Sequence, residues 1–147
     1  MISLLTEKII DIIKGTDNPE VYSEYDMIPV ENKSEKFYVV ISPVDFGGKN
    51  VKNISSGKAY DFEINYNVIC LAKKDFKAID FYDYIQEKIL KRIISSEDMK
   101  ILEFKTGSAE FDYKLQKMKI VCSLKIVGIY LVENKWKKVK FFGKWNT

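Results

Sequence analysis

Acidic side chains at alternate positions are the first residues here whose types and spacing could perform chemistry. They occur in two pairs, Asp61 with Glu63 and Glu110 with Asp112. The stretch Glu103-Phe104-Lys105 also has the Glu-x-Lys spacing of restriction-type nucleases, in which carboxylates bind Mg²⁺ and a lysine steadies the attacked phosphate. A small metal-dependent nuclease using Asp61, Glu63, Glu103 and Lys105 is therefore one hypothesis. The solvent-exposed face of an antiparallel sheet produces the same alternation without any catalytic role, and no Pro-Asp pair precedes Glu103.

The stretch Ser55-Ser56-Gly57-Lys58 resembles the end of a phosphate-binding loop. The full pattern needs a glycine five positions before the Gly-Lys pair, a Ser or Thr after it, and a helix that begins there. In this chain Lys52 occupies the first of these positions and Ala59 the last, and the residues that follow have the pattern of a strand. We interpret the stretch as the end of a loop and expect no cofactor.

Several tyrosines could act as stacking platforms for single-stranded nucleic acid, which also requires a basic groove around them. They are Tyr60, Tyr66, Tyr82, Tyr84, Tyr113 and Tyr130. The net charge of +3 comes from the last fifteen residues, and the rest of the chain is close to neutral. We therefore expect these tyrosines to pack in the core.

Residue types that catalysis most often uses are scarce. The chain has no histidine, which removes the usual general base near pH 7 and the commonest transition-metal ligand. Its two cysteines, Cys70 and Cys122, lie within apolar stretches, and we interpret them as buried free thiols. We predict no catalytic residue and no metal site. The N-terminus has no signal-peptide pattern and no apolar run is long enough to span a membrane, so we expect an intracellular protein.

The first half of the chain predicts one helix and three strands. Ile2, Leu5, Ile9, Ile12 and Ile13 follow helical spacing within residues 2–14, and Gly15 ends that helix. Residues 20–28 could form a short strand. The run from Phe37 to Ser42 favours a strand that Pro43 ends, and residues 45–57 form a long polar stretch that we predict to be a functional loop. A clear strand follows over residues 59–72, where apolar and polar residues alternate.

The second half predicts one helix and three strands. Residues 75–94 form the helix, with Asp75 as N-cap and an apolar stripe of Ile79, Tyr82, Ile85 or Gln86, Ile89, Leu90 and Ile93. Strands are expected over residues 100–105, 111–115 and 118–132. The order α-β-β-β-α-β-β-β predicts an α+β fold, a mostly antiparallel sheet with both helices on one face. Residues 1–132 would form this single domain.

Residues 133–147, the C-terminal arm, are basic and aromatic. Five lysines and four aromatic residues share this segment with one acid. It could be a final edge strand with Val139 and Phe141 inward, in which lysines protect the edge from aggregation. Alternatively its aromatic residues could anchor in a partner protein, or its lysines could bind nucleic acid or a membrane surface.

Residues 1–132 resemble the small tail terminator, or tail completion, proteins of bacteriophages and phage-tail-like particles of Firmicutes in the order of their predicted elements and in the residue patterns of those elements. The features that carry this resemblance are the N-terminal amphipathic helix, the strand at Phe37-Tyr38-Val39-Val40-Ile41, the polar segment, the long strand from Tyr60 to Val68, the helix over residues 80–94 and the closing hairpin.

The resemblance implies a structural protein without an active site. Such a protein forms a ring, usually a homohexamer, on the last ring of the tail tube, stops tube growth and joins the tube to a sheath or head-tail connector. It would be assembled in the host cytoplasm and would end in the virion or tail-like particle. Residues 45–58, the predicted polar loop with Lys58, would lie at the working face of the ring. The partner-binding residues that we predict on the loop and the arm are Lys49, Lys52, Lys58, Trp136, Lys138, Lys140, Phe142 and Trp145. No membrane partner is expected, and nucleic acid is not the favoured one.

Overall fold

Three strands of 17 residues each organise the fold: β2 (Tyr38–Ile54), β3 (Gly57–Lys73) and β6 (Lys117–Glu133). In this computed structural model, which describes residues 2–15, 20–23, 37–97 and 99–133, β3 lies between β2 and β6 and is antiparallel to both. The register aligns Val39 of β2, Cys70 of β3 and Ile120 of β6 in one row. Because side chains alternate between the two faces of a strand, this register places the apolar members of all three strands on the same face.

Shorter strands complete the sheet at its two sides. Strand β1 (Glu20–Ser23) pairs in parallel with the first four residues of β2, while β4 (Lys100–Thr106) and β5 (Glu110–Asp112) pair antiparallel with β6. The main path across the sheet is β1-β2-β3-β6-β4. The predicted α+β class, the element order and the mostly antiparallel pairing are confirmed.

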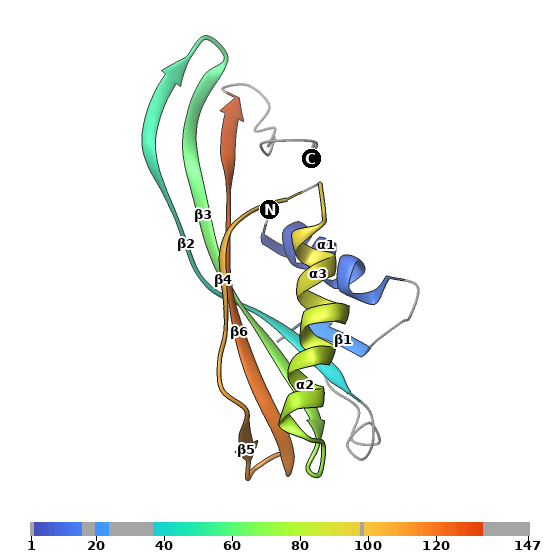
Figure 1. The fold of residues 1–147 in the computed structure, drawn as a ribbon. Helices are drawn as coiled ribbons and strands as arrows, with labels where there is room; N and C mark the ends of the chain where they lie inside the picture. The colour runs from blue at the N-terminus through green and yellow to red at the C-terminus, as the bar shows by residue number, and fades with distance from the viewer. Residues whose placement is uncertain (1, 16–19, 24–36, 98, 134–147) are drawn as a thin grey trace.

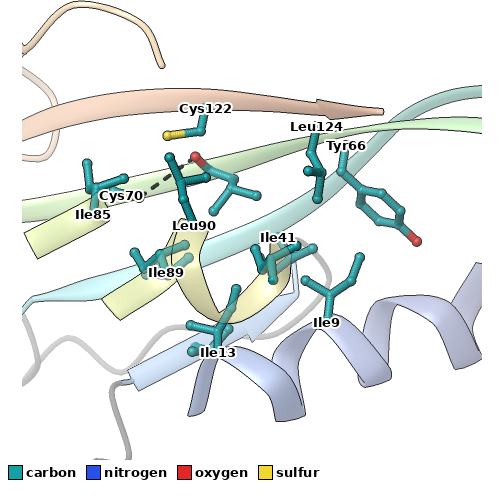
Figure 2. Packing of buried hydrophobic residues seen from close by; sticks show 14 of the residues in the cluster. Ile9, Ile13, Ile41, Tyr66, Cys70, Ile85, Ile89, Leu90, Cys122 and Leu124 are labelled. Carbon is teal, nitrogen blue, oxygen red and sulfur yellow. Dashed lines mark hydrogen bonds between the residues drawn. The ribbon is translucent and has the colours of Figure 1, made fainter. Parts of the chain in front are cut away.

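The helices pack on one face of the sheet (Figure 1). They are α1 (Ile2–Lys14) and a second helix that runs from α2 (Ala78–Ile85) through a π-helical turn (Gln86–Leu90) into α3 (Lys91–Ile94). Figure 2 shows isoleucines of α1 and of the second helix meeting the sheet residues Ile41, Tyr66 and Leu124. Burial of this shared apolar surface is the main force that holds helices and sheet together.

Both cysteines lie in this core as free thiols, as predicted. Cys70 and Cys122 are on the helix-facing side of β3 and β6, and neither side chain is exposed to solvent. Burial raises the pKa of the Cys70 thiol well above its ordinary value. A thiol in this environment is a small apolar packing group rather than a nucleophile.

The second helix differs from the predicted one in its start and in its stripe. It begins at Ala78, and Lys77 rather than Asp75 occupies the N-cap position, without a side-chain cap. Ile79 is 70% exposed and Tyr82 lies outside the core, whereas Phe81, which the predicted stripe omits, is buried. The π-helical turn lets the consecutive residues Ile89 and Leu90 both face the core, so a single helical period fitted through 79–93 has the wrong phase.

The predicted strand over residues 111–115 is too long. Strand β5 ends at Asp112, and Tyr113, which is 80% exposed, lies in the turn that leads to β6. The Asp112 carboxylate accepts a hydrogen bond from the Leu115 amide at 2.9 Å, and Gln116 adopts a positive φ of 56°. This side-chain-to-backbone bond stabilises a turn where alternation alone predicts a strand.

Residues 24–28 of the predicted short strand and residues 134–147 of the C-terminal arm lie outside the described residues. Among the described helices, none is long and apolar enough to cross a bilayer.

Candidate interaction surface on the β2–β3 hairpin

The segment predicted as a polar loop is a β-hairpin. Strand β2 continues through Pro43 to Ile54, a two-residue turn at Ser55-Ser56 follows, and β3 begins at Gly57 opposite Ile54. The register shifts between Pro43 and Asp45 and between Lys49 and Lys52, so two bulges absorb the proline and the positive φ of Asn50. We call residues 44–62 the projecting hairpin because they extend past the helices (Figure 1).

Polar side chains tie the two strands of the projecting hairpin together. The Asn50 side chain donates to the Asp61 carboxylate at 2.7 Å, and Lys49 Nζ lies 3.4 Å from Glu63 Oε1. Asn65 donates in the same way to Asp45 just below the hairpin. The polar residues that suggest a loop therefore act as cross-strand pairs.

Large apolar side chains are exposed along the outer strand of this hairpin. They are Val44 (56%), Phe46 (63%), Val51 (63%) and Ile54 (39%). Sequence reasoning missed them because it treated residues 45–57 as a polar loop, although apolar residues at 44 and 46 alternate as in a strand. Clustered exposed apolar residues on one element mark an interaction surface more often than scattered ones do.

Much of the outer edge of β2 also has no partner strand among the described residues. Strand β1 pairs with β2 only as far as Ile41, and from Val44 to Ile54 no described residue pairs with β2 on the side away from β3. An unpaired strand edge presents backbone N–H and C=O groups that can accept another strand. The edge and the exposed apolar side chains coincide, and together they form the candidate site.

The helix-facing side of the projecting hairpin carries a row of aromatic rings, to which the exposed Phe46 also belongs. Tyr60 stacks on Tyr130 of β6 with ring centroids 5.0 Å apart, and Phe62 lies 6.3 Å from both Phe46 and Tyr130. Gly48 makes this packing possible: a Cβ there would come within 2.4 Å of the Tyr60 ring. We call these four residues the aromatic row.

The structure separates the three lysines predicted on the hairpin. Lys49 and Lys52 are opposite Asp61 and Ala59 and lie on the outer face of the sheet. Lys58 is opposite Asn53 and lies on the helix-facing side. All three are exposed, and the other predicted partner-binding residues, Trp136, Lys138, Lys140, Phe142 and Trp145, fall outside the described residues.

The residues of the nuclease hypothesis lie on one face without forming a cluster. Glu63 pairs with Lys49 at 3.4 Å, and Glu103 on β4 pairs with Lys125 of β6 at 3.8 Å. Lys105 is opposite Ser123 of β6, whereas Glu63 is opposite Val127, so Lys105 lies further from Glu63 than Glu103 does. Within residues 2–15, 20–23, 37–97 and 99–133, no group of three or more His, Cys, Asp or Glu side chains is placed to hold a metal ion.

The remaining sequence candidates have structural explanations. Ser55-Ser56-Gly57-Lys58 is the hairpin turn and the start of β3, with no helix after it. Of the tyrosines, Tyr66 is in the core as predicted, whereas the prediction is wrong for Tyr82 and Tyr113, which are exposed. The Tyr82 hydroxyl instead accepts the Ala109 amide at 2.9 Å and fixes the segment between β4 and β5.

No protein family matches the sequence of this chain, and no curated protein matches it either.

Proposed function

We propose that this protein is a structural assembly protein that forms a ring on the end of a phage tail or tail-like particle. There it terminates growth of the tube and joins the tube to a sheath or connector. The observation that carries the self-assembly part of this proposal is the outer edge of β2 from Val44 to Ile54, which exposes apolar side chains and has no partner strand among the described residues. The link to phage tails comes from the resemblance in element order and residue patterns over residues 1–132.

The two sides of the sheet are suited to head-to-tail contact. Strands β2, β3, β6 and β4 alternate in direction along the sheet, so β2 and β4 run in opposite directions at its two sides. A β4 edge of one copy beside the β2 edge of the next would therefore continue the antiparallel pattern. A contact between two different surfaces of the same chain closes into a ring when the rotation between copies allows it.

Both edges expose apolar side chains, which suits them to pack against each other. The β4 edge exposes Leu102 and Phe104, and the β2 edge exposes Val44 and Phe46. Burying one such side chain completely contributes roughly 1.5–3 kcal/mol, so a few of them are enough to drive association. The exposed lysines Lys49 and Lys52 lie on the outer face beside this edge, where they could meet acidic residues of the tube protein.

The test compares Phe46→Ser with Tyr113→Ser by native mass measurement over a range of concentrations. Both changes replace an exposed aromatic residue, but Tyr113 lies in the β5–β6 turn, away from the β2 edge. We expect Phe46→Ser to weaken self-association about tenfold or more and Tyr113→Ser to leave it unchanged, in line with loss of one buried side chain. Equal behaviour of the two variants, or a wild-type chain that never associates alone or with a tube protein, contradicts the proposal.

A further inference from the structure

Two thiols lie close together in the core, and the proposed function uses neither. The register of β3 and β6 puts Cys122 opposite Val68 and Cys70 opposite Ile120, so the two cysteines are diagonal neighbours on one face of the sheet. Both side chains are fully buried, and Figure 2 shows both within the apolar core. A hydrogen bond with the Cys70 thiol lowers the pKa of Cys122, so the two sulfur atoms are within interaction distance.

The spacing of this pair does not suit a disulfide, and both cysteines are free. Diagonal neighbours in a regular antiparallel sheet are about 7–8 Å apart, whereas the Cα atoms of a disulfide are usually at most about 6.8 Å apart. An atom that lies between the two sulfur atoms and bonds to both would span the additional distance.

The ligands at this position restrict which cation can bridge the pair. Structural Zn²⁺ sites use four ligands. Within the described part of the chain no group of three or more His, Cys, Asp or Glu side chains is placed to hold a metal ion, so these residues do not supply the Zn²⁺ ligand set. Thiolates select soft cations. Among these, Cu⁺, Ag⁺ and Hg²⁺ accept linear coordination by two sulfur atoms alone.

Charge balance distinguishes between these soft cations. Both thiols lose their protons when they bind a metal, so the pair supplies two negative charges. The core cluster that contains the pair consists of apolar side chains, and burial of an uncompensated charge there is costly. Hg²⁺ gives a neutral complex with two thiolates, whereas Cu⁺ and Ag⁺ leave one negative charge in the core. The pair therefore favours a divalent soft cation.

We propose that Cys70 and Cys122 form a two-coordinate site for a soft divalent cation of the Hg²⁺ class, held in line between the two sulfur atoms. Two S–H bonds break, two S–Hg bonds form and two protons leave to solvent, with no change of oxidation state. The shortest route to the site is from the β4 side, where Thr106 is opposite Cys122 and is only half-buried. The site needs neither self-association nor a tail tube, so it is independent of the proposed function.

Competition with a monothiol tests this site. The reduced full chain and the variants Cys70→Ala and Cys122→Ala each receive one equivalent of HgCl₂ and then increasing mercaptoethanol, and bound mercury is measured by native mass spectrometry. The fold holds the second sulfur in place, so wild type should retain Hg²⁺ at monothiol concentrations about a hundredfold higher than those that strip either variant. Its mass should show one Hg²⁺ per chain and the loss of two protons.

Equal loss of mercury from all three proteins overturns the inference, and so does a wild-type chain that binds one Hg²⁺ ion on each sulfur. An ion that joins two chains also overturns it. Thermal unfolding of wild type gives a second readout that stands even if a variant fails to fold. Hg²⁺ should raise the midpoint of unfolding, because a site formed by the fold binds the native state. A lowered midpoint would mean that Hg²⁺ binds the unfolded chain instead.

Discussion

The hydroxyl oxygen of Thr6 in α1 lies 2.9 Å from the phenol oxygen of Tyr66 in β3, in the interior of the protein. The Thr6 hydroxyl also donates to the Ile2 carbonyl at 2.8 Å. Tyr66 is fully buried and is opposite Pro43, the residue directly before the projecting hairpin. This polar contact joins α1 directly to β3 within the core, beside the apolar contacts of Leu5, Ile9 and Ile13.

Tyr66→Phe should lower the free energy of unfolding by about 1 kcal/mol at neutral pH, the usual value of a buried hydrogen bond between neutral groups. Urea denaturation followed by circular dichroism measures the change. Tyr113→Phe serves as the control, because its ring is exposed and should give no measurable loss. An equally large loss of unfolding free energy in Tyr113→Phe would contradict the role assigned to Tyr66.

The stability difference between wild type and Tyr66→Phe should also depend on pH. Burial raises the pKa of Tyr66 to about 12 in the folded protein, although the hydrogen bond with Thr6 acts in the opposite direction. The unfolded chain loses this proton near pH 10, so the contribution of Tyr66 is complete below pH 10 and is lost as the pH rises toward 12. The stability difference between wild type and Tyr66→Phe should therefore shrink from pH 9 to pH 11. A difference that stays constant or grows contradicts the assignment.

Arg92→Ala should also destabilise the protein, through the C-terminal end of α1. Arg92, the chain's single arginine, donates to the Ile13 carbonyl at 2.7 Å and so satisfies the C-terminus of α1 from α3. A charged donor to a helix carbonyl contributes about 1.5–3 kcal/mol, and Lys cannot reproduce the planar guanidinium geometry. Thermal unfolding should show a large loss for Arg92→Ala and a smaller one for Arg92→Lys. Comparable stability of Arg92→Ala and wild type would show that water caps this helix equally well.

Two adjacent glycines on the hairpin offer a matched pair of substitutions. A Cβ at Gly48 would come within 2.4 Å of the Tyr60 ring, whereas a Cβ at Gly47 would meet nothing within 4 Å. Gly48→Ala should displace Tyr60 from Tyr130, change the near-ultraviolet circular dichroism and cost about 1–3 kcal/mol, as overpacking does. Gly47→Ala should leave both spectrum and stability close to wild type. If the two variants behave alike, Tyr60 does not pack over Gly48.

Lys117→Met should increase stability. The Lys117 ammonium is buried, has no hydrogen-bond partner among the described residues, and lies 5.6 Å from the centre of the Tyr38 ring. Burial lowers the pKa of this lysine below its ordinary value of 10.5, which means that the folded state disfavours the charged form. Replacing an unpaired buried charge by an apolar chain of similar length should contribute about 1 kcal/mol near pH 7.

The pH dependence of the stability difference between Lys117→Met and wild type provides a control. The penalty on the charged form is complete below the folded pKa and disappears as the pH rises through the window below 10.5, so the advantage of Lys117→Met should narrow in alkaline solution. An advantage that persists above pH 11 would mean that packing, and not charge, separates the two proteins. A destabilised Lys117→Met protein contradicts the prediction outright.

Sequence reasoning predicted the elements better than it predicted their ends and faces. The alternation of β3 and the spacing of Leu5, Ile9 and Ile13 each reflect one buried face, so the class and order of elements followed. Pro43 and the glycine pair Gly47-Gly48 suggested a break because local conformational preference does not reveal that two bulges can absorb them. The sequence prediction also chose the wrong buried face for the first part of the second helix. The π-helical turn at Gln86–Leu90 shifts the buried face, and the spacing of the residues before the turn does not reveal that shift.

The candidate site overlaps the segment that the sequence suggested, but the structure of that segment differs from the predicted loop. Residues 45–57 were identified as the working segment, yet the exposed Phe46 and Val51 and the unpaired edge depend on where β1 and the helices end. Those limits are set by packing between segments distant in the chain. Lys49 and Glu63, read as possible partner-binding and catalytic groups, are partners of each other.

The central claim, that this protein caps a tail tube, is tested most directly by electron microscopy of tubes assembled with and without it. The tube protein of the same particle is polymerised alone, with wild-type protein and with Phe46→Ser, and tube lengths and ends are recorded in negative stain. Wild-type protein should shorten the tubes and place a ring at one end of each, and Phe46→Ser should do so much less. Tubes of unchanged length with bare ends, at protein concentrations well above that of tube ends, would contradict the account.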